Sequence, residues 1–254
     1  MALQSMGMSK IQELYDACDW NFSSGKEGLP TLKQIRWLQG LLDAMEPADV
    51  GIDATRTDER LMEDEPIPKS QYGLFLAQSV TQVTYIHIHE CDDFSIGVFC
   101  FPAGATFPLH DHPNMVVLSK VLYGSVQLKS YDWVTTPNSR PKKSGLARIA
   151  ADDRVMEAPC KASVLFPRSG GNIHSFTAIT PCAVLDILAP PYSDERERPS
   201  TYFNEIPIPS LPGEFPSPIS RNAVCKRIFS LQQNSHRKAR SILTDLQSLL
   251  FSVN

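Results

Sequence analysis

The chain has 254 residues, a formal net charge of -4 and six cysteines without a CxxC pair. This length supports one well-buried core, the negative charge argues against a surface that neutralises nucleic-acid phosphates, and the scattered cysteines indicate reduced thiols. We find no apolar run of signal-peptide or membrane-spanning length. We therefore expect a monomer of the cytosol and nucleus, with no membrane partner and no direct contact with nucleic acid.

Two helices are expected at the start of the chain. Apolar side chains recur at helical spacing over residues 32–45, directly after a capping box that begins at Thr31. A weaker pattern of the same kind covers residues 11–18. Residues 48–70 are acidic and aperiodic, which is typical of a surface loop. We expect residues 1–70 to form an N-terminal region whose helices pack on the core.

From about Gln71 the apolar period changes to two, which predicts β-strands. The runs with strand character are residues 83–89, 94–99, 115–121, 126–133, 163–166, 175–179 and 183–188. Many short strands with no helices between them are typical of a sandwich, jelly roll or barrel. We expect a mainly β core over residues 71–205 and a separate C-terminal segment over residues 206–254.

Two histidines stand within a frame of glycines. Gly104, His110, His112 and Gly124 match the first cupin motif, G-x5-H-x-H-x4-E-x6-G, but Val117 occupies the position of the glutamate. An H-x-H pair by itself is more often a surface pair, whereas the glycine frame favours a metal site. Residues two apart on a strand point to the same side, so both imidazoles can be directed at one ion inside a barrel.

His174 is the expected third metal ligand. It ends the run PRSGGNIH, which resembles the second cupin motif except that Ala178 replaces its asparagine. We therefore expect a single cupin barrel, that is, a double-stranded β-helix or jelly roll, with N-terminal helices. His87 and His89 form another H-x-H pair without the glycines, and we expect them on the polar face of a strand. His236 lies in a basic stretch and is expected to be solvated.

The missing carboxylate points to a particular chemistry. Three neutral imidazoles leave a divalent ion its full charge and three open positions. An aminothiol can fill two of them through its thiolate and its amine, and O2 can fill the third, so that both oxygen atoms reach the sulfur and give a sulfinate. We expect Fe(II) as the metal and O2 as co-substrate, with no residues that bind a further cofactor.

The sequence resembles the plant cysteine oxidases, which are relatives of animal cysteamine dioxygenase. The resemblance runs through PLHDHPNMVVLSKVLYGSVQLKSYDW, FPRSGGNIHSF and LDILAPPYSD and covers about residues 31–205. It implies an enzyme that oxidises an N-terminal cysteine of a protein to cysteine sulfinic acid. In plants this reaction marks group-VII ethylene-response transcription factors for the arginine branch of the N-degron pathway. The resemblance thus implies N-terminal-Cys proteins as partners and an oxygen sensor in the hypoxia response.

The same resemblance implies that Asp186 and Tyr192 are catalytic. Asp186 would assist the metal or the substrate amine, although a carboxyl there could also be a structural acid. Tyr192 would lie near the cavity, although a tyrosine after two prolines is as often a packing residue. Ser200 stands where many relatives have a cysteine, which excludes a thioether link to Tyr202. Residues 206–254 diverge from the family, with a proline-rich stretch and then an amphipathic helical pattern.

Three alternatives remain open from the sequence. The first is a dioxygenase of a small thiol, cysteine or cysteamine; the second is a non-catalytic cupin binding module; the third is a zinc or manganese isomerase or hydrolase. A free-cysteine enzyme would need a cation for the substrate carboxylate. Arg168 is the nearest candidate, but a surface arginine is the preferred interpretation.

Overall fold

The computed structural model describes residues 8–23, 29–54, 75–76, 83–134, 144–207 and 228–233. The helices are α1 (Lys10–Phe22), α2 (Leu32–Asp43) and the 3-10 helix η1 (Pro47–Val50). The strands are β1 (Ile52–Asp53), β2 (Phe75–Leu76), β3 (Thr84–Glu90), β4 (Ser95–Phe101), β5 (Thr106–His110), β6 (Val116–Tyr123), β7 (Ser125–Trp133), β8 (Ser144–Glu157), β9 (Ser163–Leu165), β10 (Ile173–Ala178), β11 (Cys182–Ala189), β12 (Phe203–Pro207) and β13 (Ile228–Gln233).

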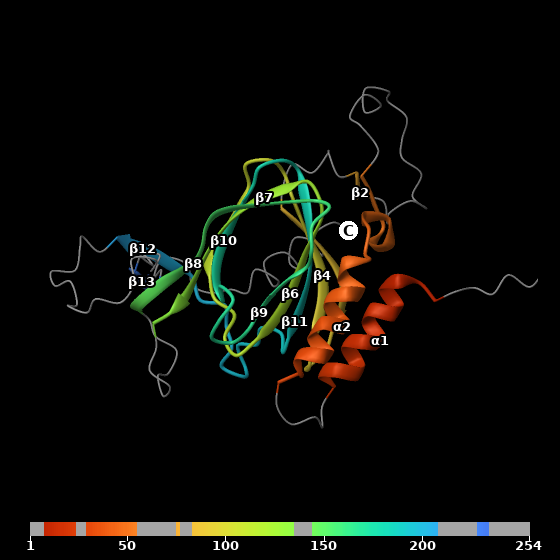
Figure 1. Ribbon diagram of the computed structural model, residues 1–254, viewed down its shortest axis with the longest axis horizontal. Helices are drawn as coiled ribbons and strands as arrows, with labels where there is room; N and C mark the ends of the chain where they lie inside the picture. Colours follow the sequence, from red (N-terminus) through yellow and green to blue (C-terminus); the bar gives the residue numbers. More distant parts are fainter. Residues whose placement is uncertain are drawn as a thin grey trace, which may run out of the picture.

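Two antiparallel sheets face each other and form the barrel (Figure 1). One sheet has the strand order β3-β4-β11-β6-β9, and the other has the order β12-β13-β8-β7-β10-β5. Neighbours such as β4 and β11, or β7 and β10, are far apart in the sequence, so the chain passes from one sheet to the other between them. This arrangement is a double-stranded β-helix, and the predicted mainly β cupin barrel with N-terminal helices is confirmed.

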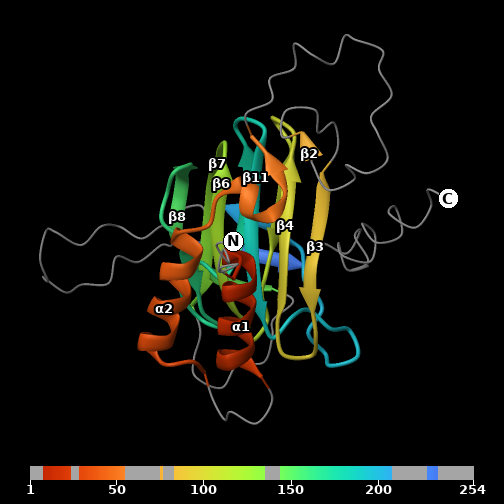
Figure 2. The ribbon, with the colours of Figure 1, turned by 90° about the vertical axis from the view of Figure 1, so that its right-hand side faces the viewer.

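The two helices pack side by side against the outer face of the five-stranded sheet (Figures 1 and 2). Their buried side chains, such as Leu14 and Leu38, share one apolar cluster with Leu118 of β6 and Ile187 of β11. Helix α2 begins with the predicted capping box, in which the Thr31 side chain accepts from a backbone N–H. The apolar stripe of each helix thus removes the outer face of this sheet from water.

A buried lysine fixes the end of α2 to the barrel. Lys120 on β6 donates from Nζ to the backbone oxygen of Asp43 at 2.8 Å and to that of Cys160 at 3.3 Å. The Asp43 carboxylate accepts from the backbone N–H of Ala162 at 2.7 Å and contacts Nζ of Lys161 at 3.0 Å. The helix end and the chain before β9 are therefore tied to each other and to β6.

Several elements differ from the sequence expectation. β8 was not predicted, because its apolar residues are interrupted by a charged DDR run that breaks the period of two. Within the expected loop 48–70, the structure places η1 and β1, while residues 55–70 lie outside the described residues. β13 comes from the segment 206–254 and pairs with β8 and β12, so this segment contributes to the sheet. His236 and the C-terminal helical pattern also lie outside the described residues.

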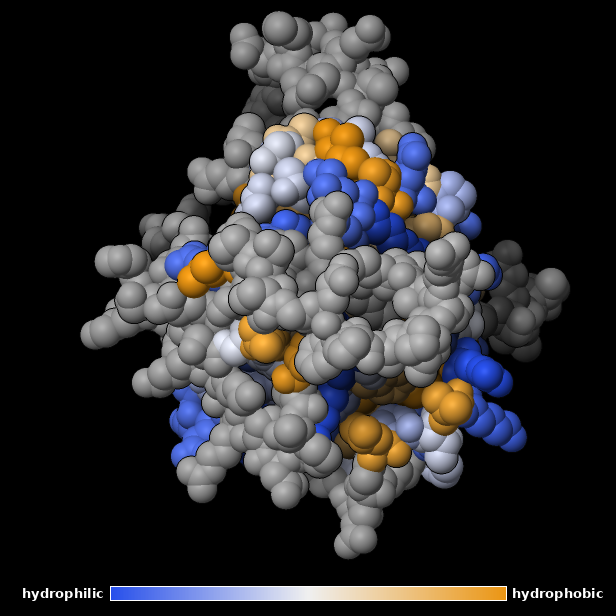
Figure 3. Space-filling view, turned by 60° about the vertical axis from the view of Figure 1, so that its left-hand side comes forward, coloured by the Kyte–Doolittle hydropathy of each residue, from blue (hydrophilic) through white to orange (hydrophobic). Residues whose placement is uncertain are grey.

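The part of the chain that the structure describes has a surface of mixed polarity and free cysteines. Figure 3 brings the side with β8, β12 and β13 forward, and its described apolar side chains occur as small groups between hydrophilic ones. The five cysteines within the described residues are free. Among the helices that the structure describes, none has the length and the apolar run needed to cross a membrane.

We predict that Gly124→Ala destabilises the barrel and that Gly40→Ala does not. Gly124 has a φ of 74°, and a Cβ there would lie 2.1 Å from the backbone oxygen of Pro181. Strained backbone and overpacking together should lower the free energy of unfolding by about 3 kcal/mol. Gly40 lies within α2, and a Cβ there meets nothing within 4 Å, so alanine should stabilise that helix by about 0.5–1 kcal/mol. Urea unfolding measures both, and equal effects would contradict the assignment of Gly124.

Candidate metal centre

The pairing of β5 with β10 sets two of the three histidines against each other. Their antiparallel register places His174 directly opposite His110. β5 ends at His110, so the expectation that His112 shares its strand is wrong. Pro113 cannot donate to a strand ladder and Asn114 has a φ of 58°, so the chain turns at this point.

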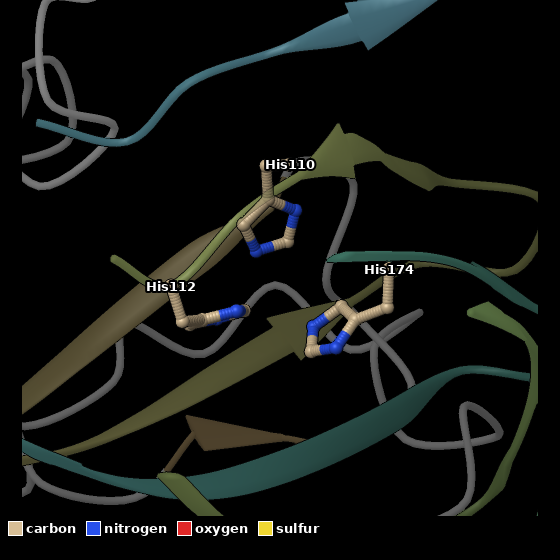
Figure 4. Close-up of side chains that lie close together, drawn as sticks. All are labelled: His110, His112 and His174. Carbon is tan, nitrogen blue, oxygen red and sulfur yellow. The ribbon is translucent and has the colours of Figure 1, made fainter. Parts of the chain in front are cut away.

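The three imidazoles nevertheless point toward one centre (Figure 4). One ligand nitrogen of each histidine lies within 4.8 Å of those of the other two. The ring centroids are 4.8 Å apart for His110 and His112, 4.8 Å for His110 and His174, and 4.7 Å for His112 and His174. The structure therefore brings together all three of the predicted ligands.

All three histidines are held neutral. Burial lowers the pKa of His110 to about 4 and that of His112 to about 3, and it places the pKa of His174 well below the usual value. Nδ1 of His110 is 2.8 Å from the Pro108 oxygen, and Nδ1 of His112 is 2.9 Å from the Asn172 oxygen. A ring that donates from Nδ1 to a carbonyl keeps its Nε2 lone pair available for a metal.

Asn172 positions His112, and sequence reasoning missed it. Its amide nitrogen donates to the backbone oxygen of His112 at 2.8 Å and to that of Phe166 at 3.0 Å. Its amide oxygen accepts from the backbone N–H of His112 at 3.1 Å. This side chain therefore joins the two motifs, and the only signal in the sequence was its place just before the strand in GGNIH.

A second missed residue, Asp132, holds the glycine loop that leads into β10. Its Oδ1 accepts from the backbone N–H groups of Gly171 at 2.9 Å and Asn172 at 3.2 Å. Gly171 has a φ of 84°, and a Cβ there would lie 2.5 Å from Oγ of Ser130. The glycine thus lets this loop approach β7 closely enough to be fixed by Asp132.

The cavity beside the histidines is lined by Val117, which replaces the glutamate of the cupin motif, and by Asp186. Val117 lines it with its buried side chain, and among the described residues the histidine cluster includes no carboxylate. Asp186 lies opposite Gly97 on β4 and Ser119 on β6. Its Oδ1 is buried without a hydrogen-bond partner, and burial raises its pKa to about 7 against a hydrogen bond from Ser119. The predicted site acid therefore borders the cavity.

Tyr192 also borders this cavity, and a hydrogen bond to Asp111, the residue between His110 and His112, holds it in place. Its hydroxyl donates to the backbone oxygen of Asp111 at 2.8 Å, and its ring centroid lies 5.7 Å from that of His112. Asp111 is buried, and its Oδ1 accepts from the backbone N–H of Thr201 at 2.9 Å. Sequence reasoning missed this carboxylate, which ties the chain before β12 to the metal motif.

Ser200 lies at the cavity, whereas Arg168 lies on the surface. Ser200 is buried and lines the cavity, and the ring of Tyr202 lies 6.3 Å from that of His110. A thioether is excluded there because position 200 carries no sulfur. Arg168 is exposed and does not line the described cavity, in agreement with a surface arginine.

His87 and His89 stay away from the centre, but for different reasons. A β-bulge separates them, so His87 lies opposite Gly97 and is exposed. His89 instead packs between Tyr15 of α1 and Phe94, with ring centroids 4.8 and 4.9 Å away. The expectation that both lie on one polar face is wrong for His89, because the bulge shifts it to the face covered by α1.

The donor set fits a divalent transition metal. Three neutral imidazole nitrogens converge, two of the rings are held by backbone carbonyls, and an apolar side chain replaces the carboxylate. His110, His112 and His174 would hold the ion.

Comparison with known proteins agrees with this geometry. The family model described as PCO_ADO matches residues 41–240. Plant cysteine oxidase 1 of Arabidopsis thaliana is 43% identical over 209 residues, which are 82% of this chain and 68% of that protein. The 2-aminoethanethiol dioxygenase of Mus musculus is 36% identical over 151 residues, 52% of this chain and 57% of its own.

Among solved structures, the chain is similar to an RmlC-like cupin from Desulfovibrio desulfuricans, with 24% identity and a TM-score of 0.30 over 43% of this chain and 84% of that one. The family match extends over most of the chain and includes all three histidines. The chain therefore belongs to the PCO_ADO family of thiol dioxygenases.

Proposed function

We propose that this chain uses Fe(II) to oxidise the N-terminal cysteine of a protein substrate to cysteine sulfinic acid. The observation that carries the proposal is a centre of three neutral histidines with Val117 where other cupins have a glutamate. Such a centre keeps the positive charge of the ion undiminished and favours an anionic thiolate. Both oxygen atoms of O2 enter the product, the sulfur is oxidised by four electrons, and no external reductant is consumed.

The residues around the metal would have separate tasks. Bound iron would supply the activation of O2 and the acidification of the thiol. The buried Oδ1 of Asp186 has no partner, so it can accept from the substrate amine or from a group beside it. Tyr192 stays neutral, because burial raises its pKa well above the usual value, and its ring borders the reacting end of the substrate. The apolar residues of the cavity limit the access of water.

A small thiol is the second candidate substrate. The cavity directly beside the histidines measures only about 40 Å3, which accommodates a group the size of a few waters. Cysteamine, which combines a thiol with an amine, is the smallest substrate that fits the same chemistry.

In the cell, we propose that the reaction senses oxygen. N-terminal-Cys proteins such as group-VII ethylene-response transcription factors would be the partners, and their oxidation would mark them for the N-degron pathway. The enzyme would act as a monomer in the cytosol and nucleus, and its substrates would accumulate in hypoxia. The resemblance to the plant cysteine oxidases supports this part of the proposal.

His174→Ala should remove the metal while the barrel stays folded. The ligand lies on β10, whose pairing with β5 and β7 does not depend on the imidazole. His87→Ala is the matched control, because His87 is exposed and outside the cluster. Reconstitution with Fe(II) under nitrogen, followed by metal analysis, should give about one iron per chain for the wild type and His87→Ala. The reverse pattern would contradict the ligand assignment, and zinc or manganese activity without iron would contradict the choice of metal.

Asp186→Asn should lower turnover and change the pH dependence of stability. The variant keeps the volume and the hydrogen-bonding capacity but loses the charge. Because burial raises the pKa of Asp186 to about 7, the folded metal-free protein binds this proton more tightly than the unfolded chain does. Asp186 therefore contributes stability that falls as the pH rises from about 4 through 7, whereas the histidines with lowered pKa values contribute in the opposite direction and Asp111 in the same one. The variant should lose only the Asp186 contribution, so its stability relative to the wild type should rise over this pH range. Turnover is measured by O2 uptake and stability by thermal unfolding; unchanged turnover would reduce Asp186 to a structural acid.

The product distinguishes the proposed reaction from its alternatives. A Cys-first peptide incubated with O2 and the iron-loaded protein should gain the mass of two oxygen atoms at its first residue, both from labelled O2. An N-acetylated copy should react far less, because its amine is blocked, and an Ala-first copy should not react. Label from water, or equal rates for the free and acetylated peptides, would refute the mechanism. Oxidation of cysteamine alone would favour the small-thiol candidate, and the absence of any oxidation would favour a binding module.

A further inference from the structure

A second and larger cavity opens beside the metal centre. It lies between the two sheets, measures about 450 Å3 and is bordered by β6, β7, β8, β9, β10 and β11. Val117, Ser119, His174 and Phe176 line both this cavity and the small one at the histidines. The two spaces therefore adjoin along these four side chains, one of which is the proposed ligand His174.

The two cavities differ in size and can therefore accommodate different parts of a substrate. About 40 Å3 at the histidines accommodates a reacting thiol and little else, whereas 450 Å3 lies within the range of about 300–1,000 Å3 that is common for ligand sites. Cysteamine would leave the larger space unused. A Cys-first peptide would have to place the residues after its cysteine somewhere near the centre, and this cavity adjoins the centre at His174 and Phe176.

The lining of the larger cavity is apolar inside and basic at its opening. Val121, Leu128 and Met156 are among its apolar side chains. Arg154 and Lys161 line the exposed end, where Lys161 is paired with the Asp43 carboxylate at 3.0 Å and Arg154 supplies the positive charge. Leu128 and Arg154 are register partners on β7 and β8, so the guanidinium comes directly at the end of the apolar part.

We propose that this cavity binds residues 2 and 3 of the Cys-first peptide and selects small or apolar side chains there. The inference rests on the proposed function and adds the substrate's preferred sequence to it. The peptide would enter past β8 and β9, where Gln39 of α2 donates to the Ala162 oxygen at 3.2 Å and forms part of the rim. A lysine at position 2 or 3 would lose hydration against apolar walls and would be repelled by Arg154 at the rim.

The first experiment fills the cavity without touching a metal ligand. Leu128→Trp adds volume from β7, and Leu146→Trp is the matched control, because Leu146 lies exposed on β8 and does not line the cavity. The filled variant should raise the KM of a Cys-Ala-Ala-Gly-Ser-Gly peptide about tenfold and leave that of cysteamine within about twofold. Calorimetric binding of the same peptide under nitrogen should weaken in parallel. The control should match the wild type in all measurements.

Two further variants keep the test decisive. If Leu128→Trp fails to fold or loses cysteamine oxidation, Ala151→Leu fills the cavity from β8, where Ala151 is the register partner of Ser130. Arg154→Glu reverses the charge at the opening. The wild type should prefer Cys-Ala-Ala over Cys-Lys-Lys peptides, and Arg154→Glu should reduce this preference by about threefold or more.

The outcomes separate this inference from the proposed function. If the wild type oxidises cysteamine but no Cys-first peptide, the proposed function is wrong. If the wild type oxidises the peptide and a folded filled variant does so with unchanged KM and Kd, only the cavity assignment is overturned. Equal use of the Cys-Ala-Ala and Cys-Lys-Lys peptides by the wild type would also overturn the selectivity.

Discussion

The pairing of β5 with β10 places His174 directly opposite His110, and the rest of the site depends on this register. A shift by one residue would turn either imidazole to the other face of the sheet. The other edge of β10 pairs with β7 along its whole length, which helps to fix the position of β10 against a shift in register. Metal binding therefore depends first on the backbone ladder of one sheet, and only then on the identity of the ligands.

Burial has opposite consequences for the two kinds of titratable group at the centre. It lowers the pKa values of the histidines and thereby supplies neutral donors for a metal. The same burial raises the pKa of Asp186, whose Oδ1 has no partner. Placing a carboxyl group there costs stability in the metal-free protein, which a bound cation and a substrate amine would offset. A cation or an amine placed next to Asp186 would favour the charged form of its carboxyl group.

The outer parts of the fold support the centre at a distance. The helices cover the sheet that carries Asp186, and Lys120 fixes the end of α2 beside the chain that enters β9. On the other sheet, β13 joins β8 to β12, so the divergent C-terminal segment completes the strand order rather than leaving it open.

The sequence alone determined the mainly β fold, the α2 capping box and the identity of the three histidines, because periodicity and motif spacing are local properties. It placed His112 on the wrong element and missed Asn172 and Asp132. The hydrogen bonds between Asn172 and His112 and between Asp132 and Gly171 join residues 60 and 39 positions apart, and nothing in the nearby sequence specifies these partners. The larger cavity could not be predicted either, since its lining side chains come from strands of both sheets that are far apart in the sequence. Only tertiary packing brings its walls to the metal centre, because side chains from six strands and α2 must first be fixed in space.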